Sequence, residues 1–126
     1  ELAAQMKERR WGRIINISSI FGLCTKEARG AYSATKAGLI GITRTMAQDL
    51  GPWNITANVI APGPMSTPLT DRLVQGELRE YFDSMVLLGR WGKAEDLMGP
   101  ALLLASDAGS YITGSTLLVD GGWMTR

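Results

Sequence analysis

Short runs of apolar, often β-branched residues alternate along the chain with longer stretches in which apolar positions recur at helical spacing. The short runs at residues 13–18, 55–61 and 116–119 are predicted to be buried strands. Helices are predicted over residues 2–10, about 31–50, a more polar region reaching about residue 85, and about 94–106. Strands that alternate with helices are typical of parallel βα units, with the helices packed over the sheet. The pattern therefore predicts an α/β fold.

Turn and cap signals set the expected ends of these helices. Gly51 is predicted to end the long helix as a left-handed cap, followed by Pro52, which cannot continue it. Thr67 and Pro68 read as an N-cap and a first helical residue. Pro100 should kink the last helix or move its true start. The long helix is expected to bury one apolar stripe, formed by Leu39, Ile42, Met46 and Leu50.

Composition narrows the class of protein. The 126 residues are 45% hydrophobic and 20% charged, which is the balance of a globular domain. A net charge of +1 gives no electrostatic reason to expect a nucleic-acid partner, and no stretch approaches the roughly 18 apolar residues of a membrane span. Cys24 is the only cysteine, which fits a reduced compartment, so we expect a cytoplasmic protein. The chain has no histidine, and we predict no metal site.

Tyr32 and Lys36 stand four residues apart near the start of the long helix. This spacing puts both side chains on one face of the helix. A free phenol has a pKa of about 10 and is a poor acid or base at neutral pH, but a nearby ammonium favours its ionised form. The pair is therefore a candidate proton donor and acceptor, although the spacing alone is weak evidence without structural context.

Ser18 and Ser19 provide that context at the end of the strand that precedes the long helix. The carboxyl ends of parallel strands line the crevice in which open α/β sheets bind ligands. A serine hydroxyl at that place can contact a substrate oxygen. Either serine can equally well serve as a turn residue that bonds its own backbone.

At this point the sequence resembles the classical short-chain dehydrogenase/reductase family. The segments that match are G-R-I-I-N-I-S-S-I-F-G with the catalytic serine, Y-S-A-T-K, I-T-A-N-V-I-A-P-G-P-M-S-T, and the ending L-A-S-D-A-G-S-Y-I-T-G-S-T-L-L-V-D-G-G. They occur in the family's order and spacing and cover essentially the whole chain. The resemblance implies a Rossmann-like, doubly wound parallel sheet, of which this chain would form the second half with about three strands.

The resemblance also implies catalytic roles for three residues. Ser19, rather than Ser18, matches the serine that orients and polarises the substrate carbonyl or hydroxyl. Tyr32 matches the general acid/base. Lys36 matches the residue that makes this tyrosine a stronger acid and holds the ribose hydroxyls of the nicotinamide nucleotide, so that Tyr32 and Lys36 are both expected at the cofactor as well.

Four further residues match the family's cofactor-binding segment. Pro62, Gly63 and the backbone of Met65 correspond to the stretch that runs beside the nicotinamide. Thr67 corresponds to the threonine that contacts the carboxamide or phosphate, a role compatible with its predicted N-cap. The cofactor implied is NAD or NADP.

The glycine-rich G-x-G-x-x-G turn that holds a dinucleotide pyrophosphate does not occur in this sequence. The residues that separate NAD from NADP are not found either. We therefore expect residues 1–126 to be the C-terminal, catalytic half of a single Rossmann domain, without its dinucleotide-binding half. Its inner strand, residues 13–18, would then lack a neighbour and favour self-association.

The implied activity is an NAD(P)-dependent oxidoreductase that interconverts a secondary alcohol and a ketone, working as a homo-oligomer, either a dimer or a tetramer. One alternative is a non-catalytic, self-associating α/β module, and another is a dehydratase or epimerase that uses the same tyrosine and lysine. The region from about residue 64 to 90 has the partly apolar character of a pocket lid. Its resemblance is closest to sugar-acid, polyol and 3-oxoacyl reductases and fixes no substrate.

The remaining conspicuous residues are interpreted as structural. Asn16 and Asn58 lie inside strands, where buried amides usually satisfy backbone groups. Trp91 and Trp123 are expected to pack in the core or at an interface rather than to hold substrate. Trp53 is expected to be a partly exposed packing residue.

Overall fold

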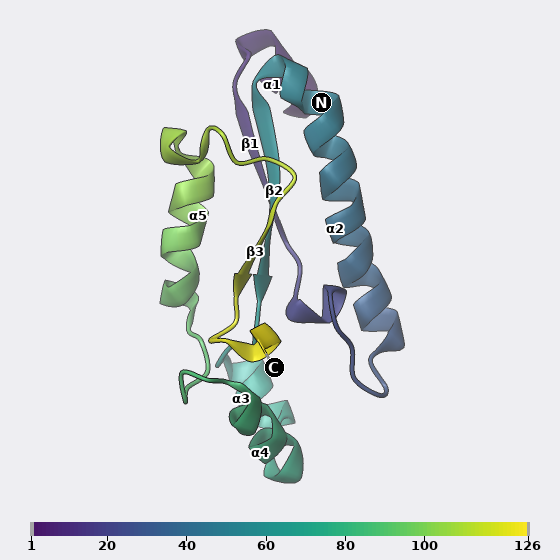
Figure 1. Ribbon diagram of the computed structural model, residues 1–126, viewed down its shortest axis with the longest axis vertical. Coiled ribbons are helices and arrows are strands. Elements are labelled where there is room, and N and C mark those ends of the chain that lie inside the picture. Colours follow the sequence, from purple (N-terminus) through teal and green to yellow (C-terminus); the bar gives the residue numbers. More distant parts are fainter. Residues whose placement is uncertain (1, 126) are drawn as a thin grey trace.

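The computed structural model describes residues 2–125, and alternating helices and strands account for most of them (Figure 1). In chain order the main elements are α1 (Leu2–Arg9), β1 (Gly12–Ile17), α2 (Gly30–Leu50), β2 (Ile55–Pro62), α3 (Pro68–Leu73), α4 (Gly76–Met85), α5 (Met98–Ala105) and β3 (Thr116–Val119). Single 3-10 turns lie between or after them: η1 (Ile20–Gly22), η2 (Gly51–Trp53), η3 (Ala94–Leu97), η4 (Asp107–Gly109) and η5 (Trp123–Thr125). The predicted elements are all present, and the polar helical region divides into α3 and α4.

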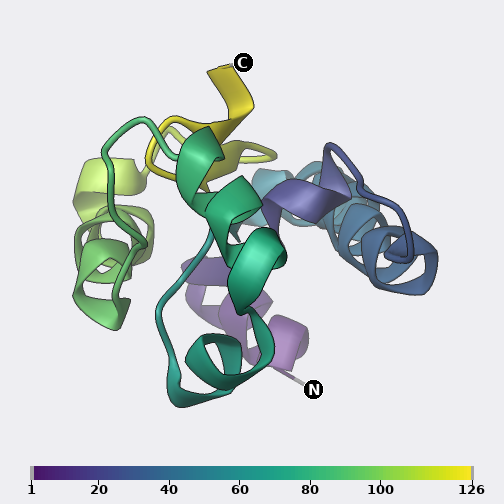
Figure 2. The same cartoon turned by 90° about the horizontal axis from the view of Figure 1, so that it is seen from below.

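The three strands form one parallel sheet in the order β1-β2-β3. Ile14 of β1 lies opposite Ala57 of β2, and Ile60 of β2 lies opposite Leu117 of β3. Helix α2 covers one face of the sheet and α5 the other, as the views in Figures 1 and 2 agree. Because both faces are covered, β2 is buried along nearly its whole length. The predicted Rossmann-like, doubly wound α/β fold is confirmed.

Two asparagines inside the strands serve the structure, as predicted. The Asn16 amide Nδ2 donates to Thr43 Oγ1 on α2 at 2.8 Å. The Asn58 amide donates from Nδ2 to the Ile112 carbonyl at 2.7 Å and accepts at Oδ1 from the Ser115 amide at 3.1 Å. These bonds fix α2 against β1 and the segment before β3 against β2.

The buried stripe of α2 differs from the one predicted. Its buried residues are Ile40, Thr43, Ala47 and Leu50, whereas Ile42 is 51% exposed. Thr43 can be buried in this stripe although it is polar, because its hydroxyl accepts a hydrogen bond from Asn16 and donates one to the Leu39 carbonyl. The small side chains of Thr43 and Ala47 allow α2 to lie close to β2.

The end of α2 is also a correction. Gly51 keeps a right-handed helical conformation, and the chain tightens into η2 instead of reversing there. The left-handed residue is Asn54, with a φ of 60°, and asparagine tolerates this region better than most residues. Its side-chain Nδ2 donates to the Arg10 carbonyl at 2.9 Å, which ties this turn to the end of α1.

Both helix starts marked by proline agree with the sequence. Thr67 is the N-cap of α3 and Pro68 its first residue. Residues 94–97 form the 3-10 turn η3, and α5 itself begins at Met98. Pro100 therefore lies in the first turn of α5, where the missing amide hydrogen would have had no intrahelical acceptor.

Helices α3 and α4 and the turn η5 gather at the carboxyl edge of the sheet, at the bottom of Figure 1. A cluster of mostly aromatic residues joins them to the loop after β1: Ile20, Phe21, Phe82, Val86, Trp91 and Trp123. Trp91 and Trp123 are buried here, which confirms them as packing residues. Trp53 is 40% exposed and lies under Lys7 and Arg10, as expected of a partly exposed packing residue.

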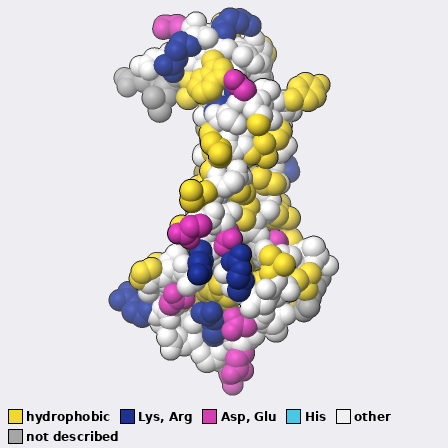
Figure 3. Space-filling model, turned by 90° about the vertical axis from the view of Figure 1, so that its left-hand side faces the viewer, with side chains coloured by type: hydrophobic (Ala, Val, Ile, Leu, Met, Phe, Trp, Pro, Cys, Tyr) yellow, Lys and Arg dark blue, Asp and Glu magenta, His cyan; other side chains and the backbone are white. Residues whose placement is uncertain are grey.

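The face of the molecule that carries α5 is apolar in its middle. Figure 3 shows hydrophobic side chains along this part, with charged side chains mainly toward the two ends. Met98 and Leu102 on α5 are 66% and 70% exposed, and Leu118 on β3 is 41% exposed. Within the described part of the chain, no helix has the length and the hydropathy needed to cross a bilayer.

Strand β1 lies at one edge of the described sheet, so we predict that it mediates self-association. Ile17, its last residue, is 49% exposed, and a charge there should oppose pairing of two edges. In sedimentation velocity at several concentrations, the wild-type chain should form dimers or larger species, and Ile17→Lys should shift toward monomer.

The matched control is Leu73→Lys, because Leu73 is 63% exposed but lies on α3 rather than on the sheet edge. It should sediment like the wild type. A wild-type chain that remains a monodisperse monomer at all concentrations would contradict association through this edge.

Candidate active site

The predicted catalytic residues lie where β1 ends and α2 begins. The Ser18 amide donates to the Ile60 carbonyl at 2.8 Å, which continues the pairing of β1 with β2 by one residue. The Ser18 hydroxyl donates to the Lys36 carbonyl at 2.7 Å. Ser18 is therefore a structural residue that fastens the end of β1 to the first turns of α2.

Tyr32 and Lys36 occupy one face of α2, as their spacing predicted. The Lys36 ammonium lies 5.7 Å from the centroid of the Tyr32 ring. The same ammonium donates to the Ile17 carbonyl at 3.1 Å, which holds it at the carboxyl end of β1. Tyr32 is 43% exposed, so its ring is accessible to a ligand.

Ser19 is buried and caps the turn η1. Its Oγ accepts a hydrogen bond from the Phe21 amide at 3.1 Å, and the Phe21 ring meets the Tyr32 ring edge-on with centroids 6.4 Å apart. Ser19 therefore bonds the backbone of a turn, which is the structural role that its position in the sequence allowed. Because the oxygen acts as an acceptor here, the hydroxyl hydrogen of Ser19 is still available for a second partner.

Gly22 has a positional role that the sequence did not reveal. A Cβ added to Gly22 would lie 2.9 Å from the carbonyl carbon and oxygen of Lys36 and from Ser18 Oγ. Only glycine lets the loop after β1 approach α2 this closely. A glycine in a loop is common, so the only sequence signal was its position between Ser19 and Tyr32.

The predicted cofactor segment begins at the carboxyl end of β2, next to β3. The Gly63 amide donates to the Val119 carbonyl at 3.0 Å, and a Cβ at Gly63 would lie 2.7 Å from the Asp120 Cα. Met65 pairs with Gly92 in a parallel bridge. The ends of β2 and β3 are therefore in close contact at the residues that the sequence assigned to the cofactor.

Thr67 closes this segment as the N-cap of α3. The Thr70 amide donates to Thr67 Oγ1 at 3.2 Å, and the Thr67 amide donates to Thr70 Oγ1 at 2.9 Å. This reciprocal pair satisfies two backbone donors of the first turn. The N-cap half of the prediction for Thr67 is confirmed, and its contact with a cofactor stays a prediction.

The predicted residues thus form two groups along one edge of the sheet. Ser19, Tyr32 and Lys36 gather at the end of β1, and the segment from Pro62 to Thr67 follows β2, its neighbour. The pairing of β1 with β2 and the aromatic cluster around Phe21 connect the two groups.

A hollow of about 150 Å³ lies beside the second group. It is lined by Pro64, Leu88, Arg90, Gly92, Asp96, Val119, Asp120 and Gly121. Arg90 donates to both oxygens of Asp96 at 2.8 Å. These bonds and one from the Lys93 amide hold the pKa of Asp96 well below its usual range. The hollow is therefore lined by charged groups, Arg90 and Asp96, that pair with each other. Tyr32 and Lys36 are not among its lining residues.

Cys24 lies in the loop between η1 and α2, next to the aromatic cluster. Burial raises the pKa of its thiol, opposed by a backbone hydrogen bond. The neutral thiol is a weak nucleophile. Cys24 therefore packs in the loop, and the geometry gives it no part in the site.

Helices on both faces of a parallel sheet, with a tyrosine and lysine pair at the carboxyl edge, define an α/β protein of the Rossmann class. The family model described as enoyl-(acyl carrier protein) reductase matches residues 1–124. The chain therefore belongs to the short-chain dehydrogenase/reductase family, as its motifs predicted.

Two relatives illustrate the range of this similarity. A 3-oxoacyl-acyl-carrier-protein reductase FabG from Aquifex aeolicus is 42% identical over 118 residues, 94% of this chain and 47% of the relative. A 2-dehydro-3-deoxy-D-gluconate 5-dehydrogenase from Escherichia coli is 44% identical over 117 residues, 91% of this chain and 46% of the relative. The chain thus spans about half the length of the relatives it matches.

A solved structure agrees in fold. The gluconate 5-dehydrogenase from Burkholderia cenocepacia, in complex with NADP and tartrate, superposes with a TM-score of 0.93 at 35% identity. The match covers 98% of this chain and 49% of that one. The arrangement of strands and helices found here is therefore that of half of this enzyme.

We predict that Gly63 is required for the close contact between the ends of β2 and β3. Gly63→Ala should lower the free energy of unfolding by about 1–3 kcal/mol, because the new methyl group would overlap Asp120. Urea unfolding followed by circular dichroism measures the change.

The same substitution at Gly38 is the control, because nothing lies within 4 Å of a Cβ added there on the exposed face of α2. Gly38→Ala should raise the free energy of unfolding by about 0.5–1 kcal/mol, since alanine favours the helix. A Gly63→Ala variant as stable as the wild type would mean that packing does not require this glycine.

Proposed function

We propose that the protein is an NAD(P)-dependent oxidoreductase that interconverts a secondary alcohol and a ketone. The observation that carries this proposal is the placement of Tyr32 and Lys36 one helical turn apart at the carboxyl end of β1, with the ammonium 5.7 Å from the phenol ring. Family membership and the names of the relatives support it. Because the chain spans about half of those relatives, the proposal concerns the whole protein.

Tyr32 is the proposed general acid/base. In the reducing direction its hydroxyl gives a proton to the substrate carbonyl oxygen, and in the oxidising direction the phenolate takes that proton back. The nearby positive charge of Lys36 stabilises the phenolate. Ser19, whose hydroxyl hydrogen is free to donate, is proposed to orient the same substrate oxygen.

The donors at this edge fit a nicotinamide nucleotide. An ammonium has three N–H donors, and within the described chain Lys36 uses one of them on the Ile17 carbonyl. The other two are suited to a pair of ribose hydroxyls, and Thr67 at the start of α3 is suited to the carboxamide or phosphate. The bound cofactor would supply or accept the hydride, while this chain holds and protonates the substrate.

The neighbours and relatives also bear on the cofactor and on the substrate of the whole protein. A neighbour solved with NADP supports the phosphorylated cofactor. Relatives named for a 3-oxoacyl thioester substrate and for a sugar acid support a small carbonyl or alcohol substrate. We further propose a cytoplasmic homo-oligomer, a dimer or a tetramer.

A non-catalytic, self-associating module is the second candidate. Strand β1 at the edge of the sheet and the exposed Ile42 on α2 favour it. The two candidates differ in one property that is simple to measure, since only a working site binds a nicotinamide nucleotide specifically.

Cofactor binding should depend on Lys36. When the protein is titrated into NADH or NADPH, we expect the change in nicotinamide fluorescence to saturate, with a dissociation constant on the order of micromolar. Lys36→Met should weaken binding at least about tenfold through loss of the ribose contacts. Lys7→Met is the matched control, because Lys7 lies on α1, beyond the amino end of β1. Absence of saturable binding by the wild type would favour the non-catalytic module.

Turnover should depend on the Tyr32 hydroxyl. In the cofactor-binding protein, Tyr32→Phe should lower kcat by about 10²–10⁴-fold or more, because the hydroxyl that is proposed to move the proton is lost. The dissociation constant for the cofactor should change little. Tyr111→Phe is the control, since Tyr111 is fully exposed after η4 and should leave kcat unchanged. Near-normal turnover by Tyr32→Phe would rule out this mechanism.

A further inference from the structure

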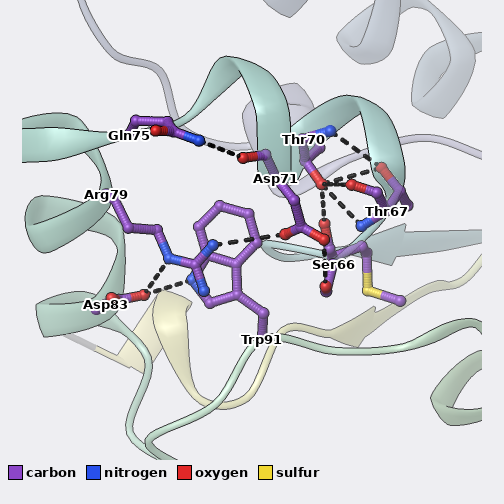
Figure 4. A network of polar contacts seen from close by, with 9 residues as sticks. Ser66, Thr67, Thr70, Asp71, Gln75, Arg79, Asp83 and Trp91 are labelled. Atoms are coloured by element: carbon purple, nitrogen blue, oxygen red, sulfur yellow. Dashed lines mark hydrogen bonds and ion pairs between the residues drawn. The ribbon is translucent and has the colours of Figure 1, made fainter.

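We propose that Arg79, on α4, is a positioning residue that holds the segment from Pro64 to Thr67 in place for cofactor binding. The cofactor part of this inference rests on the proposed function, whereas the positional part rests on geometry alone. Figure 4 shows Arg79 between Asp71 and Asp83, with its guanidinium over the ring of Trp91.

One side of Arg79 is anchored to the buried core. Its guanidinium carbon lies 3.9 Å from the centroid of the Trp91 ring. Its Nε donates to Asp83 Oδ1 at 3.0 Å, and the same oxygen accepts from Trp91 Nε1 at 2.7 Å. Because Trp91 is buried beside Phe82, this position of the guanidinium is fixed relative to the aromatic cluster.

The other side of Arg79 reaches the predicted cofactor segment through Asp71 on α3. Arg79 pairs with Asp71 Oδ1 at 3.5 Å, and Asp71 Oδ2 accepts from the Ser66 hydroxyl at 2.8 Å. The Asp71 amide donates to the Thr67 carbonyl at 2.9 Å. Asp71 therefore transmits the position of Arg79 to both Ser66 and Thr67.

The residue after Trp91 holds the same segment from its opposite side. The Gly92 amide donates to the Pro64 carbonyl at 2.9 Å, and the Ser66 amide donates to the Gly92 carbonyl at 2.8 Å. Figure 4 shows the part of this chain of contacts from Trp91 through Arg79 and Asp71 to Ser66. The backbone bonds to Gly92 close it. Loss of Arg79 would leave Asp71 and α3 attached on one side only.

These polar contacts matter because apolar packing does little to position α3. Helix α3 has six residues and none of them is buried, and Phe82 is the only buried residue of α4. Helices of this length are not stable alone and take their position from tertiary contacts. A single exposed ion pair contributes little, but a planar guanidinium shared by two carboxylates and a buried indole is a directional network. Lysine cannot reproduce that geometry.

Hydrogen–deuterium exchange on this chain tests the positional claim without cofactor. In Arg79→Met, amides in residues 66–74 should exchange about tenfold faster than in the wild type, while β2 keeps its protection. Arg79→Lys should restore little of the loss. Arg72→Met is the matched control, because Arg72 on α3 carries the same charge and its side chain makes no hydrogen bond or ion pair with the described residues.

Either of two exchange results for the Arg79→Met variant would overturn the positional claim. The first is equal exchange of residues 66–74 in Arg79→Met and Arg72→Met. The second is faster exchange that extends to β2, which would mean general destabilisation.

Asp71→Asn should reproduce the effect of Arg79→Met, and the double variant should exchange no faster than either single variant. Additive effects would likewise contradict the network.

NADPH titration and steady-state kinetics test the cofactor part. Arg79→Met should raise the dissociation constant and the KM for the cofactor about tenfold and change kcat at saturation by less than about twofold. Faster exchange with an unchanged dissociation constant would overturn the cofactor role of Arg79. If the wild type itself binds no cofactor, the proposed function fails, and the exchange data still decide the positional claim.

Discussion

The parallel pairing of β1 and β3 with the buried strand β2 is the constraint on which the rest of the structure depends. Parallel strands end at the same edge of a sheet, so this pairing brings together segments far apart in the sequence. Ser19 follows β1, Gly63 follows β2 and Asp120 follows β3. A central strand buried on both faces tolerates no shift in register, because a shift by one residue would reverse the faces of every side chain.

The position of the tyrosine and lysine pair follows from how α2 lies on this sheet. Thr43 bonds Asn16 at one level, the Lys36 carbonyl accepts from Ser18 at another, and Gly22 allows the loop to touch the helix backbone. Packed interiors of this kind change little under small forces. The Lys36 ammonium is therefore placed by several contacts, of which its own bond to Ile17 is only one.

Local patterns in the sequence predicted the strands and helices well, because burial on both faces and helical spacing leave clear marks on composition. The errors concern features decided by tertiary contacts. Thr43 is buried because Asn16, 27 residues away, satisfies its hydroxyl. The left-handed residue is Asn54 rather than Gly51 because the chain tightens through η2 and then bonds the end of α1. Neither partner can be identified from spacing.

The candidate site likewise divides into residues that motif spacing can predict and residues whose roles depend on tertiary contacts. Motif spacing predicted Ser19, Tyr32, Lys36 and the segment after β2 as site residues, and the structure brings them to one edge of the sheet, while their roles stay a prediction. Motif spacing could not reveal Gly22 or Arg79, whose roles depend on what lies opposite them in space. Arg79 in particular is one of several charged residues on a polar helix, and only the positions of Trp91 and Asp71 distinguish it from Arg72.

The two groups of the site are held in different ways, and this difference has a physical consequence. Contacts with the end of β1 and the loop after it fix α2 next to the proposed catalytic residues, whereas hydrogen bonds to Gly92 and Asp71 hold the segment from Pro64 to Thr67. Polar contacts at a surface exchange readily with water and break at a smaller cost than packed apolar ones. The proposed catalytic pair should therefore keep its geometry more firmly than the neighbouring segment does. For the proposed function, a firmly held acid/base beside a more adjustable segment would suit a site that admits and releases a nucleotide and a substrate.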